Sequence, residues 1–247
     1  MSEWFEDWFA SEDYLNVYSH RNKGDADSLL KLILANISIP ANASILDSAC
    51  GSGRHSDLLS KLGYNLFGFD LSKTLLQIGQ NNKKLHNSKV NYFCSDIRNI
   101  PLKTTFEVIL NLFTSFGYFK SDKENFAIID FASKNVKDGG YFVFDYLNPD
   151  YVRENLIQHS KQIIDSKKIV EDRRIQNGRV EKEIVIENDK FKHRYFESVQ
   201  LYSFKELLFV FKNFGFHAIK KYGNYNGDLY DENNSERMII IFQKVLE

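Results

Sequence analysis

The sequence predicts an α/β protein in which helices cover a doubly wound, mostly parallel sheet. The first observation is a short apolar run that ends at Asp47 and meets a turn with two glycines at residues 50–53, followed by a helical pattern over residues 56–62. Strand, glycine turn and helix in this order bring a ligand close to the backbone at a helix N-terminus. The second observation is that two later apolar runs also end in acids, Asp70 and Asp96. Parallel strands of this kind place three carboxylates along one edge of the sheet.

The composition is that of one compact domain, and we assign residues 1–247 to it. The 32 basic residues nearly match the 33 acidic residues, which argues against a nucleic-acid or membrane partner. No window holds the ~20 apolar residues of a membrane span. Cys50 and Cys94 show no metal or redox spacing, so we expect no metal site and a cytoplasmic location. The first residues lack the basic and apolar regions of a signal peptide, which agrees with this location.

The N-terminal segment, residues 1–40, is predicted to be helical. Aromatic side chains within residues 4–9 recur four positions apart and form a stripe on one helix face. Two interpretations stay open for them, a terminal helix docked on the core or a lid over a binding site. Residues 25–37 carry apolar side chains at helical spacing and end before a proline, which predicts a helix that faces the core.

The other elements of the sheet follow along the chain. The loop at residues 114–119 comes after the fourth strand, at the sheet edge where ligands of open α/β sheets bind. An apolar stripe predicts a helix over residues 122–136. The second to fifth strands are predicted at residues 64–70, 90–96, 106–113 and 139–146, and a helix and two antiparallel strands close the chain at residues 204–214, 216–222 and 237–245.

Residues 160–202 have a different pattern, in which polar residues alternate with apolar or β-branched ones. Asn177-Gly178 and Asn188-Asp189 are typical turn residues. We therefore predict three or so antiparallel strands inserted after the fifth strand. Most of the charges of this insert are interpreted as a solvated face, and His193 and Glu197 are singled out as candidates for substrate contact.

The chemistry of the glycine turn separates two kinds of ligand. Asp47 beside the turn would repel a pyrophosphate but favour the ammonium group of a bound amino acid. Gly51 and Gly53 allow the backbone to approach the ligand. The third glycine of a dinucleotide-binding turn is missing, because Ser56 stands at that position. The turn thus argues against an NAD-dependent oxidoreductase, which we keep as an alternative.

The segment Asp47-Ser-Ala-Cys-Gly-Ser-Gly53, followed by Asp70 and Ser95-Asp96, resembles the signature of the class I S-adenosylmethionine (SAM) dependent methyltransferases. The family has three glycines in this turn, and this chain has Ala49 at the first. The resemblance implies a Rossmann-like, seven-stranded sheet of order 3-2-1-4-5-7-6 with strand 7 antiparallel. The layout, with an insert that roofs the active site, is similar to that of small-molecule N-methyltransferases such as glycine and aminosugar methyltransferases.

The resemblance also implies which residues bind SAM. The backbone of the turn would face the methionine moiety, Asp70 would accept the ribose hydroxyls, and Asp96 would accept the adenine amino group. Hydrogen bonds to a charged acceptor contribute ~1.5–3 kcal/mol each. Tyr18 would face the sulfonium, a cation that aromatic rings attract, and Arg21 would take the carboxylate. The predicted cofactor-binding residues are Asp47, Ala49, Gly51, Gly53, Asp70, Leu71, Asp96, Ile97, Asn111, Tyr18 and Arg21.

The implied reaction is in-line displacement of the SAM methyl group by a nitrogen or oxygen of a small-molecule acceptor, which leaves S-adenosyl-L-homocysteine. Positioning alone can supply ~7–11 kcal/mol of the barrier, and an amine that arrives deprotonated needs no general base. The candidates for a catalytic role are Tyr14, His20, Tyr118 and Tyr146. Asn111-Leu-Phe-Thr stands where enzymes that methylate base amines often have a Pro-Pro-Tyr motif, so we assign no base-flipping role. The acceptor and the oligomeric state stay open, and a SAM-binding regulator without catalysis is an alternative.

Overall fold

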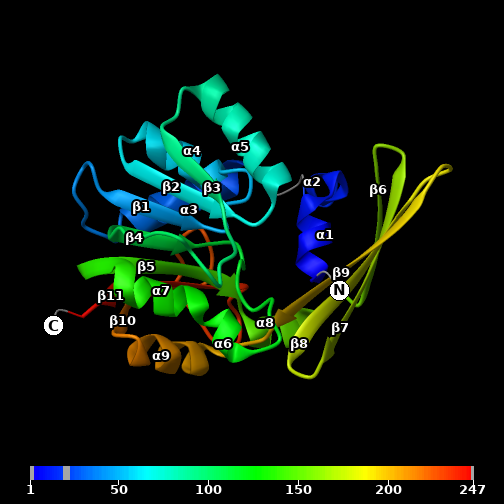
Figure 1. The fold of residues 1–247 in the computed structure, drawn as a ribbon. Coiled ribbons are helices and arrows are strands. Elements are labelled where there is room, and N and C mark those ends of the chain that lie inside the picture. The colour runs from blue at the N-terminus through cyan, green and yellow to red at the C-terminus, as the bar shows by residue number, and fades with distance from the viewer. Residues whose placement is uncertain (1–2, 19–22, 246–247) are drawn as a thin grey trace.

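The computed structural model describes residues 3–18 and 23–245. These residues form a seven-stranded sheet with helices on both faces, and a separate four-stranded sheet to one side (Figure 1). The order of the large sheet is β10-β11-β5-β4-β1-β2-β3, and β11 runs antiparallel to its two neighbours. The predicted fold class, strand order and antiparallel strand are confirmed. The strands of this sheet are β1 (Ser44–Ser48), β2 (Asn65–Asp70), β3 (Val90–Cys94), β4 (Phe106–Asn111), β5 (Val136–Leu147), β10 (Phe216–Tyr222) and β11 (Arg237–Lys244).

Successive side chains of a strand point to opposite faces of the sheet, so apolar runs build a core on each side. Along β4, Val108 and Leu110 pack in a cluster with α3 and α4, whereas Ile109 packs in the cluster of α7 and α9. This double burial explains why β4 reads as a continuous apolar run. The covering helices are α3 (Lys23–Leu34), α4 (Arg54–Lys61), α5 (Lys73–His86), α6 (Asp122–Asn125), α7 (Ala127–Asn135) and α9 (Phe204–Asn213).

The helix predicted over residues 122–136 is divided into α6 and α7 at Phe126. Asn125 is buried at this point, and its amide group bonds the backbone N–H and carbonyl of Phe119 and the hydroxyl of Tyr202. The predicted fifth strand is also longer than expected, because β5 begins at Val136. The contact between Asn125 and Tyr202 joins residues 77 positions apart, and the apolar stripe of the helix gave no sign of it.

The insert is a four-stranded antiparallel sheet in the order β6-β7-β8-β9 rather than the three or so strands expected. The predicted turn Asn177-Gly178 joins β7 to β8 with φ values of 51° and 72°. The turn Asp165-Ser166 also has two positive φ values, 47° and 64°, and its lack of glycine hid the first hairpin from the sequence pattern. The strands are β6 (His159–Ile164), β7 (Lys167–Gln176), β8 (Arg179–Glu187) and β9 (Lys192–Gln200), preceded by the unexpected helix α8 (Pro149–Asn155).

One arginine joins the insert to the loop that follows β4. Arg179 donates hydrogen bonds to the backbone carbonyls of Gly117, Tyr118 and Phe119 at 2.9–3.0 Å. The backbone N–H of Gln200 also donates to the carbonyl of Gly117, at 2.8 Å. Burial lowers the pKa of Arg179, but the guanidinium stays charged at neutral pH. The insert is therefore fastened directly to the sheet edge where the strands end.

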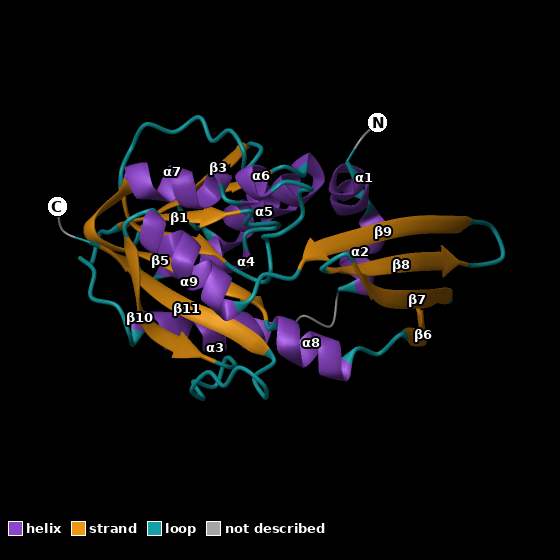
Figure 2. Ribbon diagram, turned by 90° about the horizontal axis from the view of Figure 1, so that it is seen from below, coloured by secondary structure: helices purple, strands orange, loops and turns teal. Residues whose placement is uncertain are grey.

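The N-terminal helices α1 (Trp4–Ala10) and α2 (Glu12–Val17) lie between the large sheet and the insert (Figures 1 and 2). Trp8 and Val17 pack with Ile169, Ile184 and Ile186 of the insert, and all five side chains are buried. Trp8 of the aromatic stripe thus docks on the insert, whereas Phe5 contacts Tyr118 and Phe119 in the loop after β4. Among the residues that the structure describes, no helix is long and apolar enough to cross a membrane.

Candidate active site

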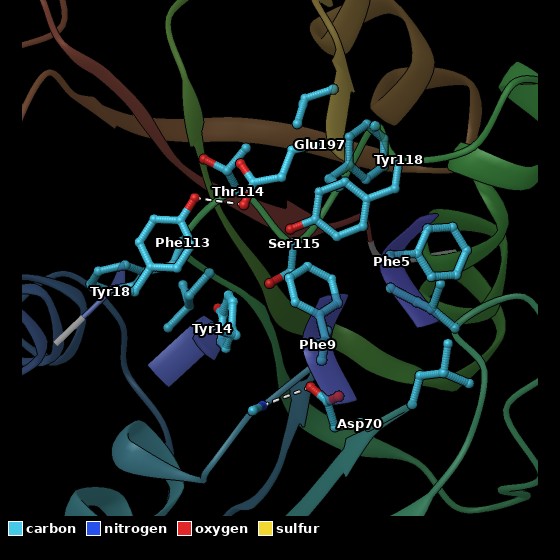
Figure 3. Close-up of a pocket in the computed structure, with 18 of the residues that line it drawn as sticks. Phe5, Phe9, Tyr14, Tyr18, Asp70, Phe113, Thr114, Ser115, Tyr118 and Glu197 are labelled. Carbon is cyan, nitrogen blue, oxygen red and sulfur yellow. Dashed lines mark hydrogen bonds between the residues drawn. The ribbon is translucent and has the colours of Figure 1, made fainter. Parts of the chain in front are cut away.

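A cavity of about 650 Å³ lies at the carboxyl ends of the parallel strands. The glycine turn and the acids after β2 and β3 form one part of its wall, and the loop after β4 forms another. The N-terminal helices and the inner face of the insert close the remaining sides. Figure 3 shows side chains from all four regions pointing toward a common centre. The volume lies within the range of ~300–1,000 Å³ that is usual for pockets of small ligands.

The backbone of the turn adopts the left-handed conformation at three positions of the motif. Ala49, Gly51 and Gly53 have φ values of 52°, 57° and 76°. A Cβ at Gly53 would also collide with the hydroxyl of Tyr92, so only glycine fits there. Ala49 therefore stands at a position that glycine adopts more readily, which explains why the family pattern has glycine there.

Asp47 is nearly fully buried at the floor of the cavity. Its Oδ2 accepts a hydrogen bond of 2.6 Å from the hydroxyl of Ser56. Burial raises the pKa of Asp47 to about 6, and the nearby carboxylate of Asp70 adds to this shift. A cationic ligand group beside Asp47 would compensate the buried charge.

Asp70 organises the loops on both sides of it. Its Oδ2 accepts from the backbone N–H of Gly51, and its Oδ1 accepts from the backbone N–H of Ser72, both at 2.8 Å. Burial raises the pKa of this carboxyl group. Asp70 and Leu71 line the cavity as expected, and each carboxylate oxygen keeps a second lone pair for a ligand hydroxyl.

Asp96 also lines the cavity, together with Ile97, but it has a partner that the sequence did not suggest. Arg98 Nη2 lies 2.6 Å from Asp96 Oδ2, and its Nη1 lies 2.9 Å from Oε1 of Glu124. Burial acts to raise the pKa of Asp96, but the hydrogen bonds from Arg98 outweigh it and lower the pKa. Arg98 also reaches Glu3 at 3.4 Å and so connects this edge of the site to the residue that caps α1.

Among the described residues predicted for the site, Gly53, Asn111, Tyr146 and His193 do not line the cavity, and Asn111 and Tyr146 lie beneath it. The side-chain amide of Asn111 donates to the hydroxyl of Ser48 at 3.0 Å and to the carbonyl of Ser115 at 3.2 Å. Tyr146 is fully buried, and its hydroxyl donates to the carbonyl of Gln200. Asn111 and Tyr146 therefore support the loop after β4 from below.

Three tyrosines from the predicted set reach the cavity, Tyr14, Tyr18 and Tyr118. Tyr118 contacts the rings of Trp4 and Phe9 with centroid distances of 5.2 and 5.7 Å. Phe9 in turn lies 5.0 Å from Tyr14, and Tyr14 lies 5.1 Å from Tyr18. These rings form a continuous aromatic wall. The remaining predicted residues, His20 and Arg21, lie outside the described residues.

A histidine and a cysteine of the turn region are unsuited to acid–base or nucleophilic chemistry. His55 lines the cavity, but burial lowers its pKa to about 3, so its ring is neutral and a weak base. Burial raises the pKa of the Cys50 thiol well above its usual value. The interpretation of Cys50 as a small buried residue agrees with this environment.

The structure adds charged residues that the sequence analysis passed over. Asp145 is completely buried, pairs with Arg237 at 2.7 Å and accepts the backbone N–H of Phe113 at 2.9 Å. It stands at the end of a strand, the same signal that pointed to Asp70. Lys182 lines the cavity and pairs with Glu197 at 2.7 Å. Along β8, Lys182 lies on the same face as the buried Ile184 and Ile186. A lysine among apolar residues of one strand face is a sequence pattern that could have pointed to this ion pair.

Within the described ranges, no group of three or more His, Cys, Asp or Glu residues could hold a metal ion. The polar groups that line the cavity are the carboxylates at the strand ends, the hydroxyls of the aromatic wall and the ion pairs of the insert. Such a site can bind, orient and enclose a ligand of mixed polarity.

Residues 45–140 match the protein family described as a methyltransferase domain. Over 110 residues the chain is 33% identical to a ubiquinone biosynthesis O-methyltransferase of Hydrogenovibrio crunogenus, which covers 44% of this chain and 45% of that protein. Over 106 residues it is 28% identical to a dTDP-3-amino-3,4,6-trideoxy-alpha-D-glucopyranose N,N-dimethyltransferase of Streptomyces venezuelae, covering 43% of each. The chain thus spans less than half the length of these curated relatives.

The similarity in structure extends over nearly the whole chain. The crystal structure of a SAM-dependent methyltransferase from Clostridium acetobutylicum superposes with a TM-score of 0.80 at 18% identity, covering 95% of this chain and 98% of that one. The comparisons confirm the predicted resemblance to the class I SAM-dependent methyltransferases, with the family match confined to residues 45–140. Because 95% of the chain is covered, most of the insert belongs to the shared fold.

Proposed function

We propose that this protein is a SAM-dependent methyltransferase that transfers the methyl group to a nitrogen or oxygen of a small molecule. The observation that carries the proposal is the cavity itself. The methyltransferase motif forms one side of it, and the insert with the N-terminal helices encloses the other. The same space can therefore hold a donor at the strand ends and an acceptor under the roof.

The donor side fits the chemistry of SAM. Asp47 would meet the ammonium group. Burial raises the pKa of this carboxyl group to about 6, and a cation beside it would stabilise the charged form. Asp70 offers lone pairs to the ribose hydroxyls, and the aromatic wall of Tyr14, Tyr18 and Tyr118 suits a sulfonium. SAM supplies an activated methyl group when bound. The residues of the chain have only to align donor and acceptor and exclude water.

The acceptor side favours an enclosed small molecule. It is walled by the aromatic rings of α1 and α2 and by paired charges of the insert, and the cavity has the volume of a small-ligand pocket. Of the predicted catalytic candidates that the structure describes, Tyr14 and Tyr118 reach this space, whereas the hydroxyl of Tyr146 is engaged beneath it. We propose Tyr14 and Tyr118 as the residues that contact the acceptor or the methyl group.

The structure also bears on the oxidoreductase alternative. Ser56, which replaces the third glycine of a dinucleotide turn, bonds Asp47 at 2.6 Å and holds this carboxylate next to the turn. A pyrophosphate bound there would face the buried acid. This arrangement supports SAM over NAD. Both described cysteines are unpaired, which supports the proposal of a cytoplasmic location.

Calorimetric titration of the protein with SAM and with NAD tests the donor. We expect SAM and S-adenosyl-L-homocysteine to bind in the micromolar range and NAD to give no heat. Asp70→Ala is expected to weaken SAM binding at least tenfold, or ~1.4 kcal/mol. Tight binding of NAD without any heat from SAM would refute the proposal.

The acceptor is tested by incubating the protein with methyl-labelled SAM and a metabolite extract, or with total RNA and DNA. Label is expected in the small-molecule fraction only, because the charge of −1 gives no basic track for phosphates. Label in the polymers would contradict the proposal of a small acceptor. SAM binding without transfer to any fraction would favour the non-catalytic regulator.

A further inference from the structure

The carboxylate of Glu197, on the inner face of the insert, binds groups from three different elements. Its Oε1 accepts hydrogen bonds from Trp8 Nε1 on α1 and from the hydroxyl of Tyr18, just after α2, both at 2.6 Å. Its Oε2 pairs with Nζ of Lys182 on β8 at 2.7 Å. Figure 3 shows Glu197 and Tyr18 joined across the cavity wall. One side chain therefore links both N-terminal helices to the insert.

The register of the insert explains why the carboxylate lies at this place. Arg173, Lys182 and Glu197 are direct neighbours on β7, β8 and β9 and form one charged row across the sheet. The row of Ile184 and Tyr195 follows on one side, within the apolar cluster that Trp8 covers. On the other side, Val180 and Val199 line the cavity, as the charged row does. Glu197 thus stands at the border between the apolar cluster and the cavity.

The charges around Glu197 are balanced within the insert. Lys182 lies 3.4 Å from Glu171, and Glu171 pairs with Arg173 at 2.5 Å. Two acids and two bases therefore neutralise one another, and Lys182 and Glu171 are buried. Lys182 also donates to the hydroxyl of Tyr18. A buried group of this kind is costly to break, because the loss of one member leaves an unpaired charge.

The groups that Glu197 holds are in contact with the aromatic wall of the cavity. Tyr18 lines the cavity and lies 5.1 Å from the ring of Tyr14. Trp8 does not line it, but its ring lies 5.5 Å from that of Tyr14 and 6.4 Å from that of Tyr18. A shift of Trp8 and Tyr18 would therefore move Tyr14 as well. The position of the wall depends on the carboxylate behind it.

We propose that Glu197 is a positioning residue for the donor site, which holds Trp8 and Tyr18 so that the aromatic wall closes on the sulfonium end of SAM. This role differs from the substrate contact that the sequence suggested for Glu197. It rests on the proposed function, because it assumes that SAM binds in this cavity.

The test combines a spectroscopic signal with an affinity. The chain has two tryptophans, so a Trp4→Phe background leaves Trp8 as the sole emitter. In this background Glu197→Leu, which removes the acceptor of Trp8 Nε1, is expected to shift the emission of Trp8 to longer wavelength and to increase its quenching by acrylamide, because the indole leaves its buried site. With Trp4 intact, calorimetry is expected to show SAM binding at least tenfold weaker in Glu197→Leu than in the wild type.

Two further variants separate positioning from other effects. Glu183→Leu removes a carboxylate from β8 that pairs with Arg194 at the surface, and it should change neither signal. The double variant Glu197→Leu/Lys182→Met restores the charge balance without restoring the acceptor for Trp8 and Tyr18. It should keep the weak SAM binding and the shifted emission if Glu197 acts by positioning. Recovery of both in the double variant would overturn the proposal in favour of a charge effect.

The other outcomes are also decisive. Unchanged Trp8 emission in Glu197→Leu would overturn the positioning role, whether or not the wild type binds SAM. A shifted emission with unchanged SAM affinity would overturn it as well, because Glu197 would then serve only the packing of α1. Failure of the wild type to bind SAM would instead refute the proposed function, and the calorimetry of the unmutated protein shows this separately.

Discussion

At the scale of a single residue, we expect the charge of the buried Asp47 to affect both the stability of the protein and its affinity for SAM. Its pKa of about 6 in the folded protein exceeds the usual value of about 4 for an aspartate, because burial penalises the charged form. The folded protein thus holds this proton more tightly than the unfolded chain. The stability that Asp47 contributes is full below about pH 4 and is lost as the pH rises through 6, by about 3 kcal/mol in total.

Asp47→Asn is therefore expected to be more stable than the wild type at pH 8, by about 1–3 kcal/mol, and to lose this advantage near pH 4. The hydroxyl of Ser56 can still donate to the amide oxygen, but the ammonium of SAM loses its counter-charge. SAM affinity should fall in the variant, and in the wild type it should fall below about pH 6. Urea unfolding at both pH values and titration with SAM measure these effects. Lower stability of the variant at pH 8 would contradict the argument.

Ala49 carries backbone strain that glycine would relieve. The left-handed conformation costs an L-residue about 1–2 kcal/mol, and the additional freedom of glycine in the unfolded chain offsets about 0.5–1 kcal/mol of the gain. Ala49→Gly is expected to stabilise the protein by up to about 1 kcal/mol, as measured by urea unfolding. Ala43→Gly is the matched control, because Ala43 is buried beside the same strand without a positive φ, and it should destabilise the protein. Equal losses in both variants would refute the interpretation of strain.

At the scale of elements, α1 and α2 form a cover that packs against the apolar face of the insert. They bury Ile169, Ile184 and Ile186, so the insert alone would expose an apolar face. The hydroxyl of Ser72, at the N-terminus of α5, donates to the carbonyl of Phe9 at 2.7 Å and ties the cover to the large sheet. We propose that the two helices are the lid that the aromatic stripe suggested, and that docking and covering are one function.

Deletion of residues 1–22 is expected to leave the large sheet folded, since its core lies in two other clusters. SAM binding should weaken at least tenfold, because Tyr14 and Tyr18 leave the site. Amide hydrogen exchange should accelerate in β7, β8 and β9, because their apolar face becomes exposed to solvent. Hydrogen exchange by mass spectrometry and calorimetry measure both effects. If the deletion variant kept its affinity for SAM and the slow amide exchange of the insert, the aromatic stripe would be a packing element and not a lid.

The elements of the large sheet could be predicted from the sequence because their signals are local. Each parallel strand is an apolar run that ends in an acid or a turn, and the pattern of residues 45–53 adds the connection to α4. The insert was harder to predict, because its register places Arg173, Lys182 and Glu197 in one row although they are 9 and 15 residues apart along the chain. Cross-strand pairing of this kind is not encoded in any short segment.

The whole molecule offers a direct measure of cofactor binding. A ligand that binds only the folded state stabilises it by about 2.7 kcal/mol at 100 times its dissociation constant. For a chain of this size, that corresponds to a rise in Tm of about 5–10 °C. We expect this rise with SAM and with S-adenosyl-L-homocysteine, and none with NAD, in a thermal melt followed by tryptophan fluorescence. Equal shifts with SAM and NAD would show that the site does not discriminate between them.

Only the donor side of the candidate site could be predicted from the sequence. The donor side is marked by Asp47, Asp70 and Asp96, which stand at or near the carboxyl ends of their strands, and all three line the cavity. The partner of Asp96 was missed, although Arg98 is two residues away, because the pairing depends on how the loop after β3 folds. The acceptor side is assembled from the two N-terminal helices, the loop after β4 and the insert. Its composition depends on the tertiary structure, and the sequence could indicate only its aromatic and polar character.

The hydrogen bond between Trp8 and Glu197 also places a condition on how the protein is made. The two residues are 189 positions apart, and one lies near the start of the chain. At a synthesis rate of about 5–20 residues per second, Trp8 leaves the ribosome about 10–40 s before its partner. During that time the aromatic residues of α1 have no insert to pack against. The cavity is therefore completed only after the insert has been synthesised, long after α1 has emerged.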